Sequence, residues 1–171
     1  MPRYAALLRG VSPINLAMPA LKKCLESAGF SNVVTVLASG NVVFDARSTS
    51  TAALEKKVEA ALEAATGREF LTVVRSIDAL LELLESDPYR GGRVPSGAKR
   101  VVTFLKHAPK PAPKLPVERD GAKIVCLKGT EAFSAYVSSP KGPVFMTLIE
   151  KTFGKGATTR TWDTVQKLTK K

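Results

Sequence analysis

The order of apolar runs in the first half of the chain is the feature that most constrains its fold. Two β-branched runs, residues 32–38 and 42–46, are separated only by Ser39-Gly40-Asn41, a triplet typical of a hairpin turn. Apolar residues with helical spacing occupy positions 21–28 before this hairpin and 54–65 after it. Each of these stripes is followed by a glycine, and short apolar runs at 3–10 and 70–75 begin and complete the series. The resulting order, strand–helix–strand–strand–helix–strand, predicts a ferredoxin-like sheet with strand order 4-1-3-2.

This topology predicts which residues meet at one edge of the sheet. The first strand is central and antiparallel to both neighbours, so it finishes where the hairpin turns. Arg9 ends the first strand, and Asn41 begins the strand beside it. We therefore expect Arg9 to lie close to Ser39 and Asn41, although some thirty residues separate them in the sequence. Glycine and asparagine suit a tight turn, but the turn requires neither Ser39 nor the arginine.

The second half predicts a further set of strands and helices. Ser76 is suited to cap a helix that ends before Asp87-Pro88, and the Gly/Pro-rich segment 89–99 is the expected boundary between domains 1–88 and 89–171. Residues 100–106 are expected to form a strand, and Lys128-Gly129 the turn of another hairpin. The expected fold class is α+β, with a ferredoxin-like βαββαβ first half. The second half is expected to be α+β too, with antiparallel strands, a proline-rich loop at 108–116, a helical stripe from Phe145 to Phe153 and a C-terminal helix.

The net charge of +11 lies entirely in the second half of the chain. Residues 1–90 hold ten basic and ten acidic residues, whereas residues 91–171 hold sixteen basic and five acidic ones. The positive electric field of such a surface concentrates phosphates or nucleic acid near it. The same charge is equally consistent with a surface that only keeps the protein soluble.

The stretch GATTRTWDTVQKL, residues 156–168, holds the second group of candidate ligand-binding residues. Thr161 is a suitable N-cap for a terminal helix, and Thr158, Thr159 and Arg160 would place hydroxyl groups and a guanidinium before its N–H groups. Such a set can bind a phosphate or a carboxylate. Asp163 opposes this interpretation because it competes for the same donors, and an ordinary capped helix explains the pattern as well.

Several function classes lack their usual residues. Cys24 and Cys126 stand far apart and His107 is the single histidine, so neither a zinc site nor a disulfide is expected. No nucleophile elbow, zinc-protease motif or P-loop occurs, and we expect no cofactor and no metal. No apolar run approaches the roughly 18 residues of a membrane span, and the start does not resemble a signal peptide. The sequence is therefore expected to be that of a cytoplasmic protein without a membrane partner.

Three stretches together resemble a bacterial family of unknown function, number 1697. They are YAALLRGV, VVTVLASGNVVF and ATTRTWDTVQKL, in this order and spacing. Two features depart from the family pattern: SPINLA, residues 12–17, replaces a usual Gly-Gly pair, and Thr161 replaces a usual asparagine. The resemblance implies an α+β fold of ferredoxin-like character and supplies no established activity.

These observations lead to one main hypothesis and two alternatives. The main hypothesis is a non-catalytic or weakly catalytic module that binds an anionic ligand, either a phosphate-bearing metabolite or nucleic acid. One alternative is an enzyme acting on a phosphorylated small molecule, with His107 or Asp163 as its titratable group. The other is a protein-interaction module that docks through residues 108–116. The ligand-binding residues of the main hypothesis are Arg9, Ser39, Asn41, Thr158, Thr159 and Arg160.

Overall fold

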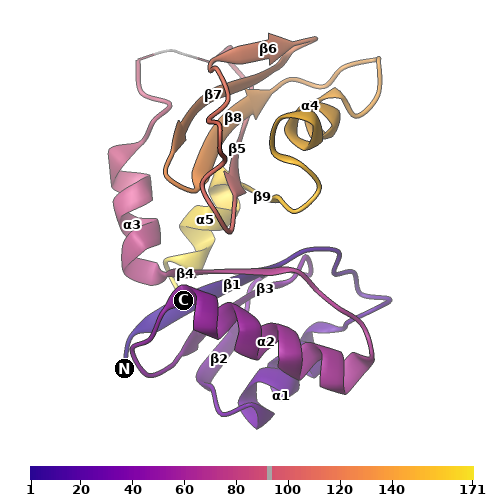
Figure 1. Ribbon diagram of the computed structural model, residues 1–171, viewed down its shortest axis with the longest axis vertical. Coiled ribbons are helices and arrows are strands. Elements are labelled where there is room, and N and C mark those ends of the chain that lie inside the picture. Colours follow the sequence, from indigo (N-terminus) through magenta and orange to yellow (C-terminus); the bar gives the residue numbers. More distant parts are fainter. Residues whose placement is uncertain (92–93) are drawn as a thin grey trace. The chain divides into compact units, whose positions relative to one another are not determined.

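A four-stranded antiparallel sheet forms the first half of the chain (Figure 1). The strand order is β2-β3-β1-β4, so the predicted ferredoxin-like order is confirmed. Side chains of β1 and β3 that share one face of the sheet form a single core with both helices that the sequence predicted. The elements are β1 (Arg3–Leu8), α1 (Met18–Ser27), β2 (Ser31–Thr35), β3 (Asn41–Asp45), α2 (Thr51–Thr66) and β4 (Thr72–Ser76).

The helix α3 (Ile77–Ser86) follows β4 directly. The Ala79 N–H donates to the Ser76 hydroxyl oxygen at 3.1 Å, which confirms the predicted cap. A capped first turn fixes where the chain leaves the sheet.

A five-stranded antiparallel sheet forms the second half, in the order β6-β7-β8-β5-β9. The predicted strand, hairpin and helical stripe are present as β5, β7–β8 and α4, whereas β6 and β9 were not predicted. Apolar side chains of α4 pack on one face of this sheet. The elements are β5 (Lys99–Phe104), β6 (Val117–Arg119), β7 (Ala122–Lys128), β8 (Glu131–Tyr136), α4 (Val144–Phe153), β9 (Thr158–Thr161) and α5 (Trp162–Leu168).

An aromatic cluster packs on the other face of the second sheet. Tyr89 lies edge-on to Trp162 with ring centroids 5.2 Å apart and edge-on to Phe133 at 6.1 Å. Edge-to-face contacts of this kind are favourable arrangements of aromatic rings. Trp162 is therefore a packing residue at the start of α5.

This computed structural model describes residues 1–91 and 94–171, which divide into two compact units. Unit 1 comprises Met1–Glu85 with Val165–Lys171, and unit 2 comprises Ser86–Thr164. The predicted boundary near residues 88 and 89 stays a prediction about domains that fold separately. Within the described ranges, no helix has the length and apolar composition needed to cross a membrane.

Candidate functional site

Arg9 directly follows β1, at the end of the sheet where the β2–β3 hairpin turns. Leu7 is the cross-strand partner of Asn41, and the Leu8 N–H donates to the Gly40 carbonyl at 2.9 Å. The Arg9 N–H donates to the Leu71 carbonyl at 2.9 Å on the other side. The main chain of Arg9 is thus fixed beside residues 39–41, as the topology predicted.

The hairpin turn is held by the side chain of Asn41, which is fully buried. Asn41 Nδ2 donates to the Val36 carbonyl at 3.0 Å and to the Ser39 hydroxyl oxygen at 2.9 Å. The Val36 N–H donates back to the Asn41 carbonyl at 2.8 Å, which closes the turn. Both amide hydrogens of Asn41 therefore serve the turn, and Asn41 orients the exposed Ser39.

Gly40 is required at its position for two reasons. Its φ of +86° lies in the left-handed region, and a Cβ built there would lie 2.9 Å from Val11 Cβ and 3.1 Å from Leu8 Cβ. A side chain at position 40 would push the turn away from the end of β1. Gly40 thus allows Ser39 and Arg9 to lie near each other.

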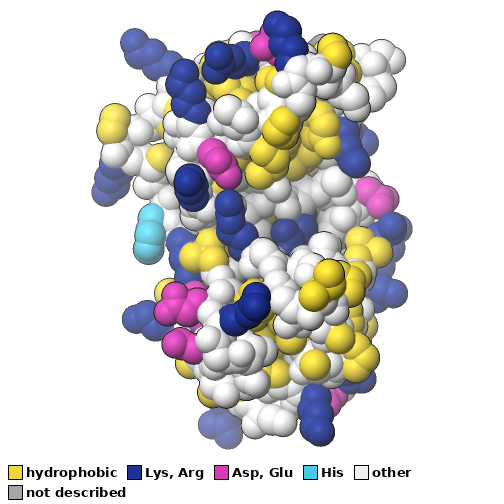
Figure 2. Space-filling model, turned by 90° about the vertical axis from the view of Figure 1, so that its right-hand side faces the viewer, with side chains coloured by type: hydrophobic (Ala, Val, Ile, Leu, Met, Phe, Trp, Pro, Cys, Tyr) yellow, Lys and Arg dark blue, Asp and Glu magenta, His cyan; other side chains and the backbone are white. Residues whose placement is uncertain are grey.

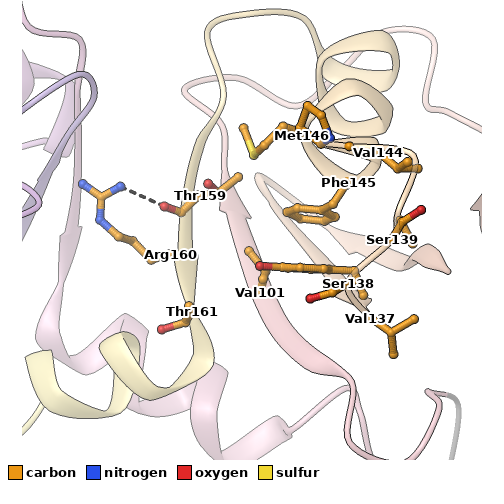
Figure 3. A pocket seen from close by; sticks show the side chains of 14 residues that line it. Val101, Val137, Ser138, Ser139, Val144, Phe145, Met146, Thr159, Arg160 and Thr161 are labelled. Atoms are coloured by element: carbon orange, nitrogen blue, oxygen red, sulfur yellow. Dashed lines mark hydrogen bonds between the residues drawn. The ribbon is translucent and has the colours of Figure 1, made fainter. Parts of the chain in front are cut away.

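The segment predicted to place hydroxyl groups and a guanidinium before a helix is the edge strand β9. Side chains alternate across a strand, so Thr158 and Arg160 share one face of β9 and Thr159 points to the other. Figure 3 shows the Arg160 guanidinium on the opposite side of β9 from Phe145 and Met146. Thr158 is 1% exposed, and its hydroxyl has no hydrogen-bond partner among the described residues. The two threonines therefore flank Arg160 without converging on one point.

The Arg160 side chain is partly buried. Its Nη1 donates to the carbonyl of Thr159 at 2.8 Å, which fixes the direction of the side chain (Figure 3). Burial lowers the pKa of Arg160 to about 10, because desolvation disfavours the charged form. The group still carries its positive charge at neutral pH.

Thr161 is the N-cap of α5, which confirms that prediction. The Thr164 N–H donates to the Thr161 hydroxyl oxygen at 3.2 Å, and the two threonine hydroxyls lie 2.9 Å apart. Asp163 lies in the first turn of the helix. The hydroxyl of Thr161 is thus committed to the helix.

The six predicted ligand-binding residues are distributed over both units. Arg9, Ser39 and Asn41 belong to unit 1, where the structure brings them together, and Thr158, Thr159 and Arg160 belong to unit 2. A single pocket shared by the two groups stays a prediction. Gly92 and Arg93, the latter one of the sixteen basic residues in 91–171, lie outside the described residues.

Sequence reasoning did not predict a cavity that lies within unit 2. Its walls include Tyr136, Phe145 and Met146, from runs whose spacing indicated only core packing. Val137 and Met146 are exposed although they lie beside buried residues, and this exposed apolar surface distinguishes the cavity from the core. Because exposure depends on how the chain folds, the sequence pattern did not reveal it. Among the described residues, no group of three or more His, Cys, Asp or Glu side chains could hold a metal ion.

Comparisons with known proteins place the chain in a family. A family model described as "Protein of unknown function (DUF1697)" matches residues 1–133, and no curated protein matches. A similar solved structure is that of the conserved bacterial protein SP0830 from Streptococcus pneumoniae, with 20% identity and a TM-score of 0.73. The match covers 99% of this chain and 97% of that one, and at this identity it shows the fold alone. Because the family model matches most of the chain, this protein belongs to the DUF1697 family of proteins of unknown function.

Proposed function

We propose that the protein binds anionic ligands and that each unit has its own binding residues, Arg9 and Ser39 in unit 1 and Arg160 in unit 2. The observation that carries this proposal is the arrangement at the end of β1. There the main chain of Arg9 is fixed beside a turn in which Asn41 orients the hydroxyl of an exposed serine at 2.9 Å. An arginine and a serine at one sheet edge can supply a guanidinium and a hydroxyl, which are suitable donors to a phosphate or carboxylate oxygen.

Arg160 supports the proposal through its environment. A partly buried guanidinium interacts with an anion more strongly than an exposed one, because the local dielectric constant is lower. The carbonyl of Thr159 orients it, and the hydroxyl of Thr158 lies on the same face of β9. In this proposal Asn41 positions the Ser39 hydroxyl, and the main-chain carbonyl of Thr159 positions the Arg160 guanidinium.

The ligand class follows from charge. The excess of basic residues lies in residues 91–171, which favours an anion with several charges, either a phosphate-bearing metabolite or a nucleic acid strand. A nucleic acid would be held through its backbone phosphates, without selection of bases.

The test is a pair of binding titrations on the full chain. The probes are inorganic tripolyphosphate, followed by calorimetry, and a fluorescein-labelled single-stranded oligonucleotide, followed by anisotropy at several salt concentrations. Arg9→Gln and Arg160→Gln should each weaken binding at the altered unit by about tenfold or more, as expected for a lost charge-assisted hydrogen bond, and the double variant should abolish it. A steep salt dependence confined to the oligonucleotide would identify nucleic acid as the ligand class.

The control variants remove a positive charge elsewhere. Arg47→Gln in unit 1 and Lys155→Gln in unit 2 change exposed side chains and should leave both affinities within twofold (about 0.4 kcal/mol). Circular dichroism should show that the arginine variants unfold cooperatively. Unchanged affinity in the double variant would refute the proposal, as would equal losses in the two controls.

A further inference from the structure

A cavity of about 380 Å³ lies within unit 2, at the first turn of α4 (Figure 3). Strand residues on the face that α4 covers form its floor, among them Val101, Ala122 and Thr159. Phe145 and Met146 of α4 form one wall, and the segment 137–143 forms another through Val137, Ser138, Ser139, Gly142 and Pro143. Its volume is in the range of pockets that hold small molecules.

The walls of this cavity are flat and apolar. The rings of Tyr136 and Phe145 are stacked with centroids 4.7 Å apart and planes at 14°. Met146 and Val137 also line the cavity, and they are 36% and 40% exposed. Figure 2 shows the side of unit 2 on which α4 lies, where hydrophobic side chains gather between lysine and arginine side chains. Apolar surface of this kind in a concave site gains free energy when a flat apolar molecule covers it.

The polar groups of the cavity are uncharged. Ser138 and Ser139 contribute to the wall formed by segment 137–143, and the side chain of Thr159 forms part of the floor. Arg160 also lines the cavity, but its guanidinium lies on the opposite side of β9 (Figure 3). No other described lining residue is acidic or basic. A phosphate would therefore lose its hydration here without gaining a cation, whereas a hydroxyl or carbonyl group can pair with the serines.

The segment 137–143 contacts the turn that precedes β7. The Val137 N–H donates to the Gly121 carbonyl at 3.0 Å, and Lys141 forms an ion pair with Asp120 at 3.0 Å. Two separate contacts thus tie this segment to the turn between β6 and β7. A wall that is already in place loses little entropy on binding.

From these features we infer that the cavity in unit 2 binds a small, planar, uncharged aromatic molecule that carries one hydrogen-bonding group. The rings of Tyr136 and Phe145 and the thioether of Met146 contact its faces and edges. The serine hydroxyls orient its polar group. The cavity lies on the opposite side of β9 from the Arg160 guanidinium, and its ligand differs from a phosphate in both charge and shape.

The methionines provide a direct test. The chain contains three, and only Met146 lines this cavity, whereas Met1 and Met18 belong to unit 1. The full chain labelled with ¹³C at the methionine methyl groups is titrated with 2-naphthol, which is neutral at pH 7. The expected result is a saturable upfield shift of the Met146 methyl signal, caused by the ring current of the probe, with the other two signals unmoved. Naphthalene, which lacks the hydroxyl, should bind several-fold more weakly, and inorganic phosphate should not displace 2-naphthol.

Val137→Asp places a carboxylate at the rim and should weaken 2-naphthol binding by about tenfold or more, because the probe would desolvate that charge. Val34→Asp is the matched control, since Val34 is 38% exposed on β2 of unit 1, and it should bind as the unchanged protein does. Equal shifts of all three methyl signals would overturn the inference by showing adsorption at no particular site. The absence of a saturable shift would also overturn it, as would a Val137→Asp variant of unchanged affinity. A Met146 signal that moves with protein concentration alone would overturn it in favour of a second copy covering the cavity.

Discussion

At the scale of single residues, Tyr89 shows how a polar atom can stabilise a sheet from one face. Its hydroxyl lies 2.8 Å from the carbonyl oxygen of Val101 and 2.9 Å from that of Ser134, which are cross-strand partners on β5 and β8. The ring is buried, and burial raises the pKa of the phenol. The single hydroxyl donor thus serves two buried carbonyl groups. Removing it should therefore destabilise the protein by more than the loss of an exposed hydrogen bond would.

Tyr89→Phe should lower the free energy of unfolding by about 1–3 kcal/mol at neutral pH. Urea denaturation followed by the fluorescence of Trp162, the single tryptophan and a neighbour of Tyr89, measures this difference. The pKa is raised in the folded state, so the unfolded chain releases the phenol proton first as the pH rises through 10.0. The contribution of Tyr89 is therefore complete below that pH and decreases above it, and the gap between wild type and variant should narrow in alkali. A gap that stays constant from neutral pH to pH 11 would show that the phenol is not buried as described.

At the scale of elements, the first half of the chain was predictable because its local signals agree with one another. The β-branched runs, the helical stripes and the glycine after each stripe all indicate the same order, and the topology then brings Arg9 to the turn at 39–41. The buried amide of Asn41 could not be predicted in this way. Its two hydrogen bonds depend on the path of residues 36–40, which the sequence pattern does not specify.

The two strands that the sequence did not predict are edge strands. β6 (Val117–Arg119) is three residues long and follows the proline-rich loop, so it has too few residues for alternation to be recognised. β9 consists of Thr-Thr-Arg-Thr, which is polar on both faces and was interpreted as the approach to a helix. The β-branched threonines were the available signal for a strand. If these residues had been interpreted as a strand, the alternation of side chains along it would have predicted that Thr159 and Arg160 point to opposite faces.

The turn between β2 and β3 can be tested with two glycines near the proposed anion site. Gly40→Ala combines a φ of +86° with a Cβ 2.9 Å from Val11 Cβ, and it should lower the free energy of unfolding by about 2–4 kcal/mol. Gly10→Ala is the matched control: its φ is +78°, but nothing lies within 4 Å of the added Cβ, so a loss of only about 1 kcal/mol is expected. Chemical denaturation followed by circular dichroism compares the two. Equal losses of unfolding free energy in the two variants would mean that the contact between an added Cβ at position 40 and Val11 does not contribute to the destabilisation.

At the scale of the whole molecule, unit 1 is built from two separate stretches of the chain. After completing unit 2 the chain returns to unit 1 with residues 165–171. Arg3 Nε donates to the carbonyl of Lys171 at 2.9 Å, so β1 and the last residue are joined within unit 1. Val165 and Leu168 are fully buried in this returning segment. The sequence-based division at residues 88 and 89 assigns residues 165–171 to the second domain instead. The two assignments therefore predict that a substitution in this segment destabilises different parts of the protein.

Leu168→Ala distinguishes these divisions. Removing a fully buried leucine side chain should cost about 2–5 kcal/mol, and if residues 165–171 fold with unit 1, amide hydrogen exchange should accelerate in β1 and β3. Leu148→Ala, the same change in the core that α4 forms with its own sheet, should instead accelerate exchange in β7 and β8. Mass spectrometry of the exchanged peptides follows both variants. Faster exchange of β7 and β8 in the Leu168 variant, with β1 unaffected, would assign the C-terminal segment to the second domain. Equal acceleration in all four strands by both variants would mean that the chain unfolds as one cooperative body, because a loss confined to either core would then be transmitted to the other.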